Sequence, residues 1–293
     1  MENTNWIVMR KATILFPVAV AALLLLLLPA CSTKEEILEE ATYSIEIAAV
    51  KGSAETRALA LNGNVLNAPW EAGDKVYVYR MSPSPSVGYE QVGILFATSS
   101  GNSTTLTGKL TGIFYKGDYL LFSYLHELSF KYTGQDGSLG YIASNCDYAF
   151  ASQQLKEIGS GTISFAGDLS FESMQSIVKF TLKDQDGNLL TANKLSLRLL
   201  YESDGNENDV LAQSFEPLVA SASENGGFQF GPLDVIPESP SSEFYVALMC
   251  TVQSGKLVLS ASSNDSEYTY TIETFTIQPD NYYLCDVKMT KQE

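Results

Sequence analysis

The sequence predicts an all-β protein, organised as two tandem β-sandwich domains that follow an N-terminal export signal. Three observations support this prediction. Apolar and polar residues alternate with a period of two along most segments after residue 41, as they do in half-buried strands. Val, Ile, Tyr, Phe and Thr dominate these segments, and clusters of Gly, Asn, Asp and Ser separate them. No stretch after the leader keeps a convincing helical period over three turns.

The N-terminal segment has the features of a bacterial lipoprotein signal. Two basic residues precede an apolar run over residues 12–28, and Leu28-Pro29-Ala30 stands directly before Cys31. A basic start, an apolar centre and a small residue at the cut are typical of a secretory signal. The cysteine that follows indicates cleavage and lipidation, so we expect removal of residues 1–30 and acylation of Cys31, with palmitate among the acyl chains. A plain cleaved signal and a retained membrane anchor are the alternatives, because the run is near the minimum length for a membrane span.

Residues 31–41 are polar and acidic, and we interpret them as a lipidated tether. Lys34, Glu35 and Glu36 resemble the surface-export tag of Bacteroides-type lipoproteins. Acyl chains contribute about 0.8 kcal/mol per buried CH₂, so a multiply acylated Cys31 would hold the chain on a membrane. The predicted location is the outer membrane, with the protein lipid-anchored and exposed at the cell surface.

Length and charge limit the partners of the mature chain. The 293 residues include 18 basic and 34 acidic ones, and the formal net charge is −16. Removal of the leader takes away more basic than acidic residues, so the mature form is still more acidic. This charge argues against nucleic acid as a partner and against electrostatic binding to anionic lipid. The remaining length is enough for two ordinary domains.

Strand candidates follow one another at the spacing of a β-sandwich. The first set comprises residues 43–51, 76–79, 92–97, 104–110 and 119–124. The second set comprises residues 177–182, 194–200, 228–230, 244–251, 256–260, 268–277 and 282–289. Short helical turns are expected near 139–146 or 209–216. A flexible Gly-rich stretch at residues 158–162 lies between the two sets, so we expect an N-terminal sandwich over residues 42–168 and a C-terminal one over 169–293.

The cysteines do not indicate a metal site or a disulfide framework. With Cys31 acylated, the odd number that remains leaves at least one thiol unpaired. No CxxC or Cys/His spacing of a zinc site is present. Each remaining cysteine has apolar or aromatic neighbours, so we expect buried thiols. Cys250 and Cys285 are the pair that could instead form a disulfide.

No motif in the sequence indicates catalysis, and we expect no enzyme activity, no cofactor and no metal site. His126 is the sole histidine, and no nucleophile elbow, zinc-protease or Walker motif occurs. Two acidic loops, at residues 184–188 and 204–209, carry many oxygen atoms but do not match the ligand spacing of a calcium loop. Trp70 could stack on a sugar, although such a residue more often packs in the core of its domain.

A string of segments over nearly the whole mature chain carries a family resemblance. After Cys31 these segments are residues 43–51, 55–59, 70–79, 106–112, 132–137, 147–149 and 176–184. In them the sequence resembles the fimbrillin family of Bacteroidales, the lipoprotein precursors of major and minor fimbriae and their many surface relatives. No catalytic motif belongs to this pattern.

The resemblance implies two transthyretin-like β-sandwiches in tandem and a lipidated precursor that is moved to the outer surface. In some members an Arg-specific cut removes the N-terminal strand, and the groove left behind accepts a strand from the next subunit. This is β-strand addition to an open sheet edge. Arg57 occupies the matching place in this chain, and cleavage there would leave Ala58 as the first residue. The alternation of Tyr43, Ile45 and Ile47 suits a removable inserted strand.

Two functions are therefore predicted as alternatives. The leading one is a structural or adhesive surface lipoprotein, which processing at Arg57 would turn into a pilus subunit located in a fimbrium. Its partners would be other fimbrillin-like subunits, or receptors on host or bacterial surfaces. If Arg57 is only an exposed loop residue, the groove stays filled and the lipoprotein stays monomeric. The second function is a glycan-binding surface lipoprotein that supplies a nutrient importer.

Overall fold

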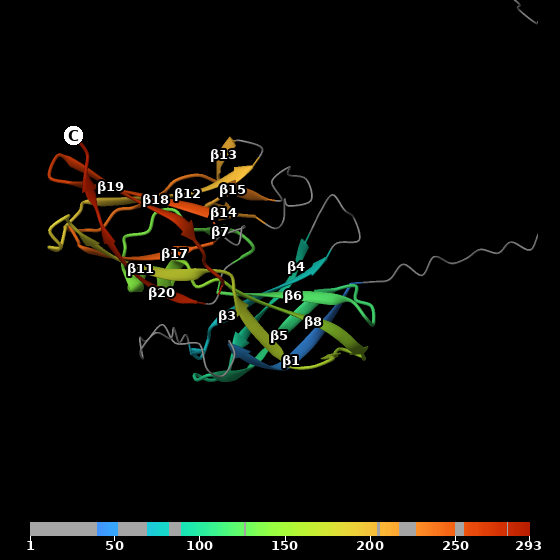
Figure 1. Ribbon diagram of the computed structural model, residues 1–293. Helices are drawn as coiled ribbons and strands as arrows, with labels where there is room; N and C mark the ends of the chain where they lie inside the picture. The colour runs from blue at the N-terminus through green and yellow to red at the C-terminus, as the bar shows by residue number, and fades with distance from the viewer. Residues whose placement is uncertain are drawn as a thin grey trace, which may run out of the picture. The chain divides into compact units, whose positions relative to one another are not determined.

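The computed structural model describes residues 40–51, 69–81, 89–125, 127–203, 206–216, 227–249, 255–279 and 281–293 (Figure 1). The predicted lipidation and processing positions, Cys31, Arg57 and Ala58, lie outside these residues, as do His126 and Cys250. In the described part of the chain every element but one helix is a strand, which confirms the all-β prediction. The arrangement as two tandem sandwich domains stays a prediction.

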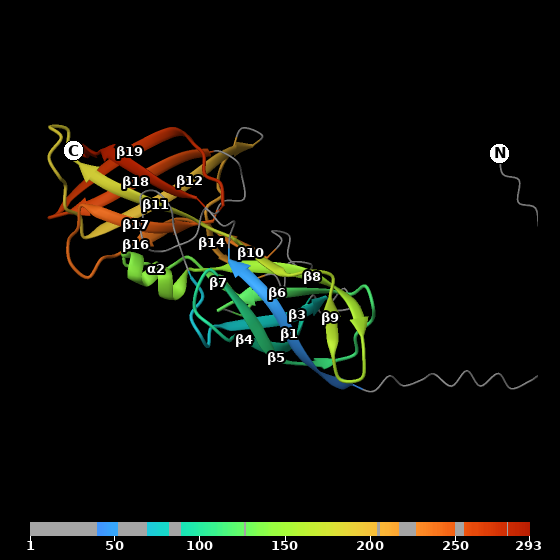
Figure 2. The same cartoon turned by 90° about the horizontal axis from the view of Figure 1, so that it is seen from below.

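The first sheet has eight strands in the order β10-β1-β5-β4-β3-β6-β8-β9. Their bounds are β1 Ala41–Lys51, β3 Lys75–Met81, β4 Tyr89–Ala97, β5 Ser103–Gly112, β6 Tyr119–Tyr124, β8 Ala149–Ile158, β9 Ile163–Phe165 and β10 Leu169–Ser173. β10 also pairs with β8, so the sheet closes on itself as a ring from which β9 branches. As a result β1 has a neighbour on each side, antiparallel β5 and parallel β10 (Figure 2).

Three further sheets contain the other strands: β17-β11-β20, β13-β12-β18-β19-β21 with β16 beside β12, and β15-β14-β7. Their bounds are β7 Phe130–Lys131, β11 Ser176–Lys183, β12 Lys194–Ser203, β13 Asn206–Asp209, β14 Ala212–Phe215, β15 Phe228–Phe230, β16 Leu233–Val235, β17 Glu243–Leu248, β18 Gly255–Ser263, β19 Ser266–Phe275, β20 Tyr282–Lys288 and β21 Thr290–Lys291.

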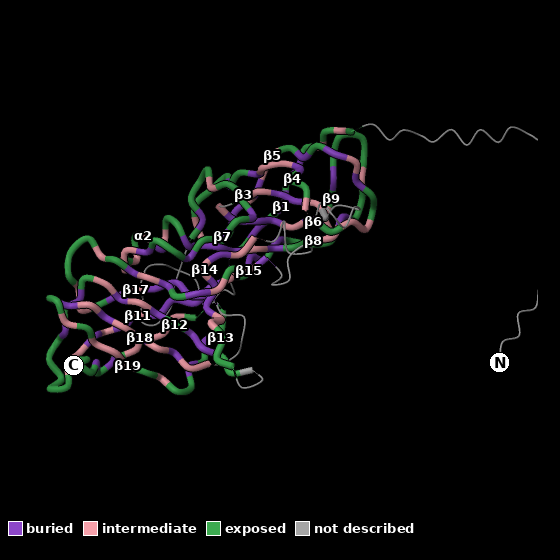
Figure 3. The backbone as a smooth tube through the Cα atoms, turned by 90° about the horizontal axis from the view of Figure 1, so that it is seen from above, coloured by how far each residue is buried: buried purple, intermediate pink, exposed green. Residues whose placement is uncertain are grey.

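The buried apolar residues of the described chain form two clusters. The first is enclosed by the closed ring and includes Trp70, Leu106 and Phe122. The second lies among the other three sheets and includes Phe180 and Phe244. In Figure 3 buried stretches alternate with exposed ones along the strands, as period-two patterning requires. The period is clearest in β1, β10 and β18, where every second residue is buried over part of the strand.

A segment between β6 and β8 belongs to the second cluster although it lies within the first half of the chain. β7 pairs with β14, and the helix α2 (Leu139–Asn145) follows it. The hydroxyl of Ser138 accepts a hydrogen bond from the backbone N–H of Tyr141 at 3.0 Å, which caps the helix start, and Ile142 is buried. The helical turn expected near 139–146 is confirmed. The turn expected near 209–216 is wrong, because β13 and β14 occupy that region.

The stretch at residues 158–162 is the tight turn of the β8–β9 hairpin. Gly159 donates its backbone N–H to the carbonyl of Thr162 at 2.9 Å. β10, which follows this turn, pairs with β1 and β8 and so continues the first sheet beyond residue 168. Residues 40–293 form one compact unit. The division into domains at 42–168 and 169–293 therefore stays a prediction, with β10 placed in the first sheet.

Candidate functional site

The site suggested by the sequence is the groove that holds β1. The side chains of Ile45 and Ile47 are 3% and 6% exposed, and Ala49 is fully buried. The residues between them face solvent, and Glu46 is exposed. β1 thus inserts one apolar face into the first cluster, as the alternation predicted, and presents a polar face outside.

Backbone pairing holds β1 along its whole length. Its register with β5 runs from Ala41 opposite Gly112 to Val50 opposite Ser103. The parallel pairing with β10 covers only the end of the strand, from Ala49 opposite Leu169 onward. Antiparallel β5 is therefore the main partner of β1, and β10 closes the ring at one end.

Besides its pairing with β5, the beginning of β1 makes one aromatic contact and one backbone hydrogen bond. The half-buried ring of Tyr43 meets the ring of Phe114 edge-on, with centroids 5.6 Å apart. The backbone N–H of Ser44 donates to the carbonyl of Gly161 at 2.9 Å. The three predicted residues Tyr43, Ile45 and Ile47 therefore lie on one face of a single inserted strand.

The end of β1 carries a buried cation that the sequence reasoning did not single out. The side chain of Lys51 is 1% exposed, and its Nζ lies 3.6 Å from Oδ2 of Asp74. The same Nζ lies 3.2 Å from the ring centroid of Tyr124 and 4.6 Å from that of Trp70. A charge in such a place is tolerated because a carboxylate and two aromatic faces replace its water shell.

The groups around Lys51 are themselves tied together. Oδ2 of Asp74 accepts hydrogen bonds from the Tyr124 hydroxyl at 2.8 Å and from the backbone N–H of Glu71 at 2.9 Å. Trp70 meets the rings of Tyr124 and Phe171 edge-on, at 5.2 and 5.4 Å. Burial is the main reason that the pKa of Tyr124 is raised far above its ordinary value, and the charge of Asp147 adds to it. The phenol therefore stays protonated and donates to the carboxylate.

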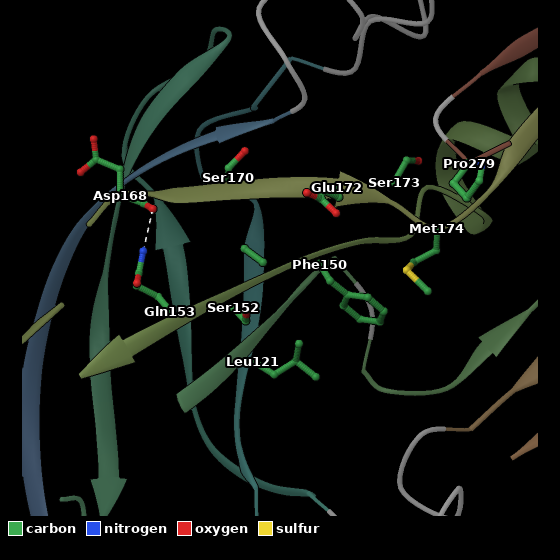
Figure 4. A pocket seen from close by; sticks show the side chains of 11 residues that line it. Leu121, Phe150, Ser152, Gln153, Asp168, Ser170, Glu172, Ser173, Met174 and Pro279 are labelled. Carbon is green, nitrogen blue, oxygen red and sulfur yellow. Dashed lines mark hydrogen bonds between the residues drawn. The ribbon is translucent and has the colours of Figure 1, made fainter. Parts of the chain in front are cut away.

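A hollow of about 600 Å³ lies on the outside of the ring where β8 and β10 separate (Figure 4). Its lining carries carboxylates, hydroxyls and an amide, together with Phe150 and Met174. The Gln153 amide bridges the gap by donating to the carbonyl of Asp168 at 3.0 Å. The ring of Phe150 packs edge-on against Phe130 at 5.0 Å, so this aromatic group belongs to the protein's own packing.

The chain was compared with known proteins. No family model matches it, and no curated protein matches it. Among solved structures it is similar to a candidate cell adhesion protein from Bacteroides ovatus ATCC 8483, at 16% identity and a TM-score of 0.42, covering 86% of this chain and 96% of that chain.

It is also similar to a candidate cell adhesion protein from Bacteroides uniformis ATCC 8492, at 9% identity and a TM-score of 0.43, covering 84% of this chain and 96% of that one. A fimbrial protein from Bacteroides ovatus ATCC 8483 matches at 9% identity and a TM-score of 0.35, covering 82% of this chain and 47% of that one. All three structures have TM-scores below 0.5 and identities below 25%.

The remaining sequence predictions have mixed outcomes. Trp70 is fully buried, so the idea that it stacks on a sugar is wrong and the core role is confirmed. Cys146 and Cys285 are free thiols; Cys146 is buried as expected, whereas Cys285 is only half-buried. The loop at 184–188 is a turn in which the Asp184 carboxylate accepts from the backbone N–H and the side-chain amide of Asn188, at 2.8 and 3.1 Å.

Among the residues that the structure describes, no helix is long and apolar enough to cross a membrane. Within the same ranges no three His, Cys, Asp or Glu side chains gather in a way that would hold a metal ion.

The burial of Lys51 could have been predicted from the alternation of apolar and polar residues in β1. Lys51 is in phase with Ile45, Ile47 and Ala49, so it sits on the apolar face of the strand. A charge on that face predicts either a strand end at the surface or a buried ion pair. Asp74, whose carboxylate pairs with Lys51, is 23 positions away in a turn, and no local sequence pattern connects the two residues.

Proposed function

We propose that the protein is a fimbrillin-like surface lipoprotein with a structural or adhesive role, and that β1 is its replaceable strand. Acylated Cys31 would anchor the precursor in the outer membrane. Cleavage after Arg57 would detach β1 from the rest of the chain and leave a groove for a strand of a neighbouring subunit. The observation that carries the proposal is the insertion of β1 between β5 and β10 with its apolar face in the core.

The location of the proposed cut supports this mechanism. β1 ends at Lys51, and the next described residue is Pro69, so Arg57 falls in the connection between β1 and the rest of the ring. A cut there leaves β1 held by non-covalent contacts alone. It also separates the ring from Cys31, because the lipidated residue stays on the β1 side. One cleavage would thus release a subunit from its membrane anchor and prepare its groove.

The energetics favour replacement of the strand over an empty groove. Full burial of an isoleucine side chain is worth about 1.5–3 kcal/mol, and β1 buries both Ile45 and Ile47. Loss of β1 would also leave the edge of β5 unpaired over the length of the strand. A groove with those properties binds an extended segment that presents alternate apolar side chains.

The test uses the chain without its leader, treated with an Arg-specific protease. We expect a product that begins at Ala58 and forms a ladder of oligomers on size-exclusion chromatography. Arg57→Ala should block both the cut and the ladder, whereas Arg198→Ala, which removes an exposed arginine from another sheet, should block neither. A product beginning at Ala58 that stays monomeric with β1 bound would refute strand exchange.

A second measurement tests the role of the apolar face. Ile47→Ala should loosen β1 and speed the appearance of oligomers after cleavage. Glu46→Ala, on the exposed face of the same strand, should leave the rate unchanged. Equal rates for the two variants would show that the buried face does not control exchange.

The anchor is tested separately in cells. Cys31→Ala should abolish lipid labelling and release the protein from membranes. Retention of this variant in the membrane fraction would indicate an uncleaved anchor helix. Protease treatment of intact cells should degrade the wild-type protein, and full protection would contradict surface exposure. The glycan-binding alternative loses its stacking residue with the burial of Trp70, and no second function is proposed.

A further inference from the structure

The cluster around Lys51 is built from parts that do not leave with β1. Trp70 and Asp74 precede β3, Tyr124 ends β6, and Phe171 lies on β10 opposite Lys51 in the register. We call these four residues the Lys51 site. If β1 is removed, the cation departs and the carboxylate and aromatic rings stay behind.

The vacated site would be chemically selective. Asp74 would keep its two hydrogen-bond donors, the Tyr124 hydroxyl and the Glu71 N–H, but would lose its counter-charge. The Asp74 side chain is 12% exposed, so a strand without a cation would leave its carboxylate largely shielded from water and without a counter-charge, which is unfavourable. The ring faces of Tyr124 and Trp70 also attract a cation and offer an apolar side chain no such gain.

We propose that the Lys51 site selects the strand that enters the groove, by requiring a lysine at the register of Lys51. This proposal rests on the proposed function and deepens it. The partner it specifies is an extended segment with apolar residues at the positions of Ile45 and Ile47, a small residue at that of Ala49 and a lysine two residues further on. Segments that match only the apolar pattern are rejected.

The site also distinguishes lysine from arginine. The Lys51 side chain is 1% exposed and its Nζ lies 3.2 Å from the centroid of the Tyr124 ring, so the compact ammonium fills the space. A guanidinium is planar and broader and needs room for a fork of donors. Arginine at this position should therefore enter less well than lysine, despite its equal charge.

The protein carries its own reporter of this event. The chain has two tryptophans, Trp6 in the leader and Trp70 in the Lys51 site. In a protein without the leader, Trp70 is the sole indole, and Lys51 Nζ lies 4.6 Å from its ring. Departure or entry of the cation should change the fluorescence of Trp70 directly.

The experiment uses the whole leaderless chain after cleavage at Arg57, so that both pieces are present. Fluorescent peptides of residues 41–51 compete with the resident strand, and they carry Lys, Met or Arg at the last position. A peptide with Glu46→Gln, altered on the exposed face, is the matched control. Incorporation is followed by native electrophoresis and by Trp70 fluorescence.

We expect the Lys peptide to bind at least about tenfold more tightly than the Met peptide, because breaking an ion pair that is largely shielded from water is costly. The Arg peptide should lie between them, and the Glu46→Gln peptide should match the Lys peptide. In protein carrying Asp74→Asn the preference for Lys over Met should largely disappear. Because the peptide comparison needs no change in the protein, it stands even if that variant folds poorly.

The outcomes separate the two proposals. If no peptide enters, including the one with the native sequence, strand exchange itself is wrong. If the Lys and Met peptides enter equally well, the groove exchanges strands but the Lys51 site does not select them. If the Arg peptide enters as well as the Lys peptide, the Lys51 site selects for positive charge alone and does not distinguish an ammonium from a guanidinium by shape.

Discussion

Gln135 joins the segment between β6 and β8 to the edge of β17, and its replacement should destabilise the protein strongly. Its side chain is 1% exposed. Nε2 donates to the carbonyls of Tyr132 at 2.7 Å and Ala247 at 2.9 Å, and Oε1 accepts from the N–H of Ala247 at 2.8 Å. The side chain therefore supplies to Ala247 both of the bonds that a neighbouring strand would supply.

The expected magnitude follows from what Gln135→Leu leaves behind. Leucine has a similar size but makes no hydrogen bond, so the buried N–H and C=O of Ala247 both lose their partner. A buried unsatisfied group costs about 1–3 kcal/mol, which gives a loss of about 2–6 kcal/mol for the two. Urea unfolding should show this loss as a lower midpoint, and hydrogen exchange should show faster exchange at the Ala247 amide.

Gln185→Leu is the matched control. The Gln185 amide donates to the carbonyls of Lys288 and Met289 and to the hydroxyl of Thr290. Gln185 is exposed, so water can replace these hydrogen bonds when the amide is removed. Gln185→Leu should lower the free energy of unfolding by no more than about 0.5 kcal/mol. Equal losses for the two variants, or unchanged exchange at Ala247, would refute the argument that burial makes the Gln135 bonds valuable.

Three further predictions concern reactivity, packing and pH. Cys146 is buried and burial raises the pKa of its thiol to about 12, so mass mapping after treatment with a thiol reagent at pH 8 should find Cys146 unmodified in the folded protein. Burial also raises the pKa of the Cys285 thiol, but Cys285 is only half-buried and should be modified first; native labelling of Cys146 before Cys285 would contradict the fold. Gly93→Ala should lower thermal stability by about 1–3 kcal/mol, because a new Cβ would strike the backbone of β5, whereas Gly167→Ala has only a flexible glutamine amide 3.4 Å away and should be near neutral. Burial raises the pKa of Tyr132 well above its usual value, so its contribution to stability is complete below about pH 10 and is lost as the pH rises further. In an alkaline titration followed by tyrosinate absorbance, Tyr132 should ionise only when the protein unfolds; ionisation of all tyrosines in the folded protein would contradict its burial.

Alternation predicted the strands with a strong apolar face and failed where the face is weak. β11 was predicted because every residue from Ile177 to Leu182 except Lys179 is β-branched or large and apolar. β8 was missed because its inward positions include Ala149 and Ala151, and Ala and Gln are poor strand formers. Its strand conformation comes from pairing with β6 on one side and with β9 and β10 on the other. Only the pairing with β9 is local in sequence, and the pairings with β6 and β10 form between segments that no local pattern connects.

The candidate site was predicted in the same uneven way. The face formed by Tyr43, Ile45 and Ile47 follows from local pattern alone. The Lys51 site does not, because Asp74 and Tyr124 come from different strand ends and meet only when the ring closes. Local patterns can identify which residues are buried, but the partner of a buried charge is decided by topology.

The closed ring also sets the order in which the chain can complete itself. Among the described strands β1 comes first, yet its two neighbours follow about 60 and about 120 residues later, so its pairings have a high contact order and form slowly. The other strands of the ring can meet through shorter loops while β1 still waits for β10. The first of the described strands is then the last to be paired on both sides. A folding chain would pass through a stage in which the groove for β1 is already formed and β1 competes for it with any other extended segment.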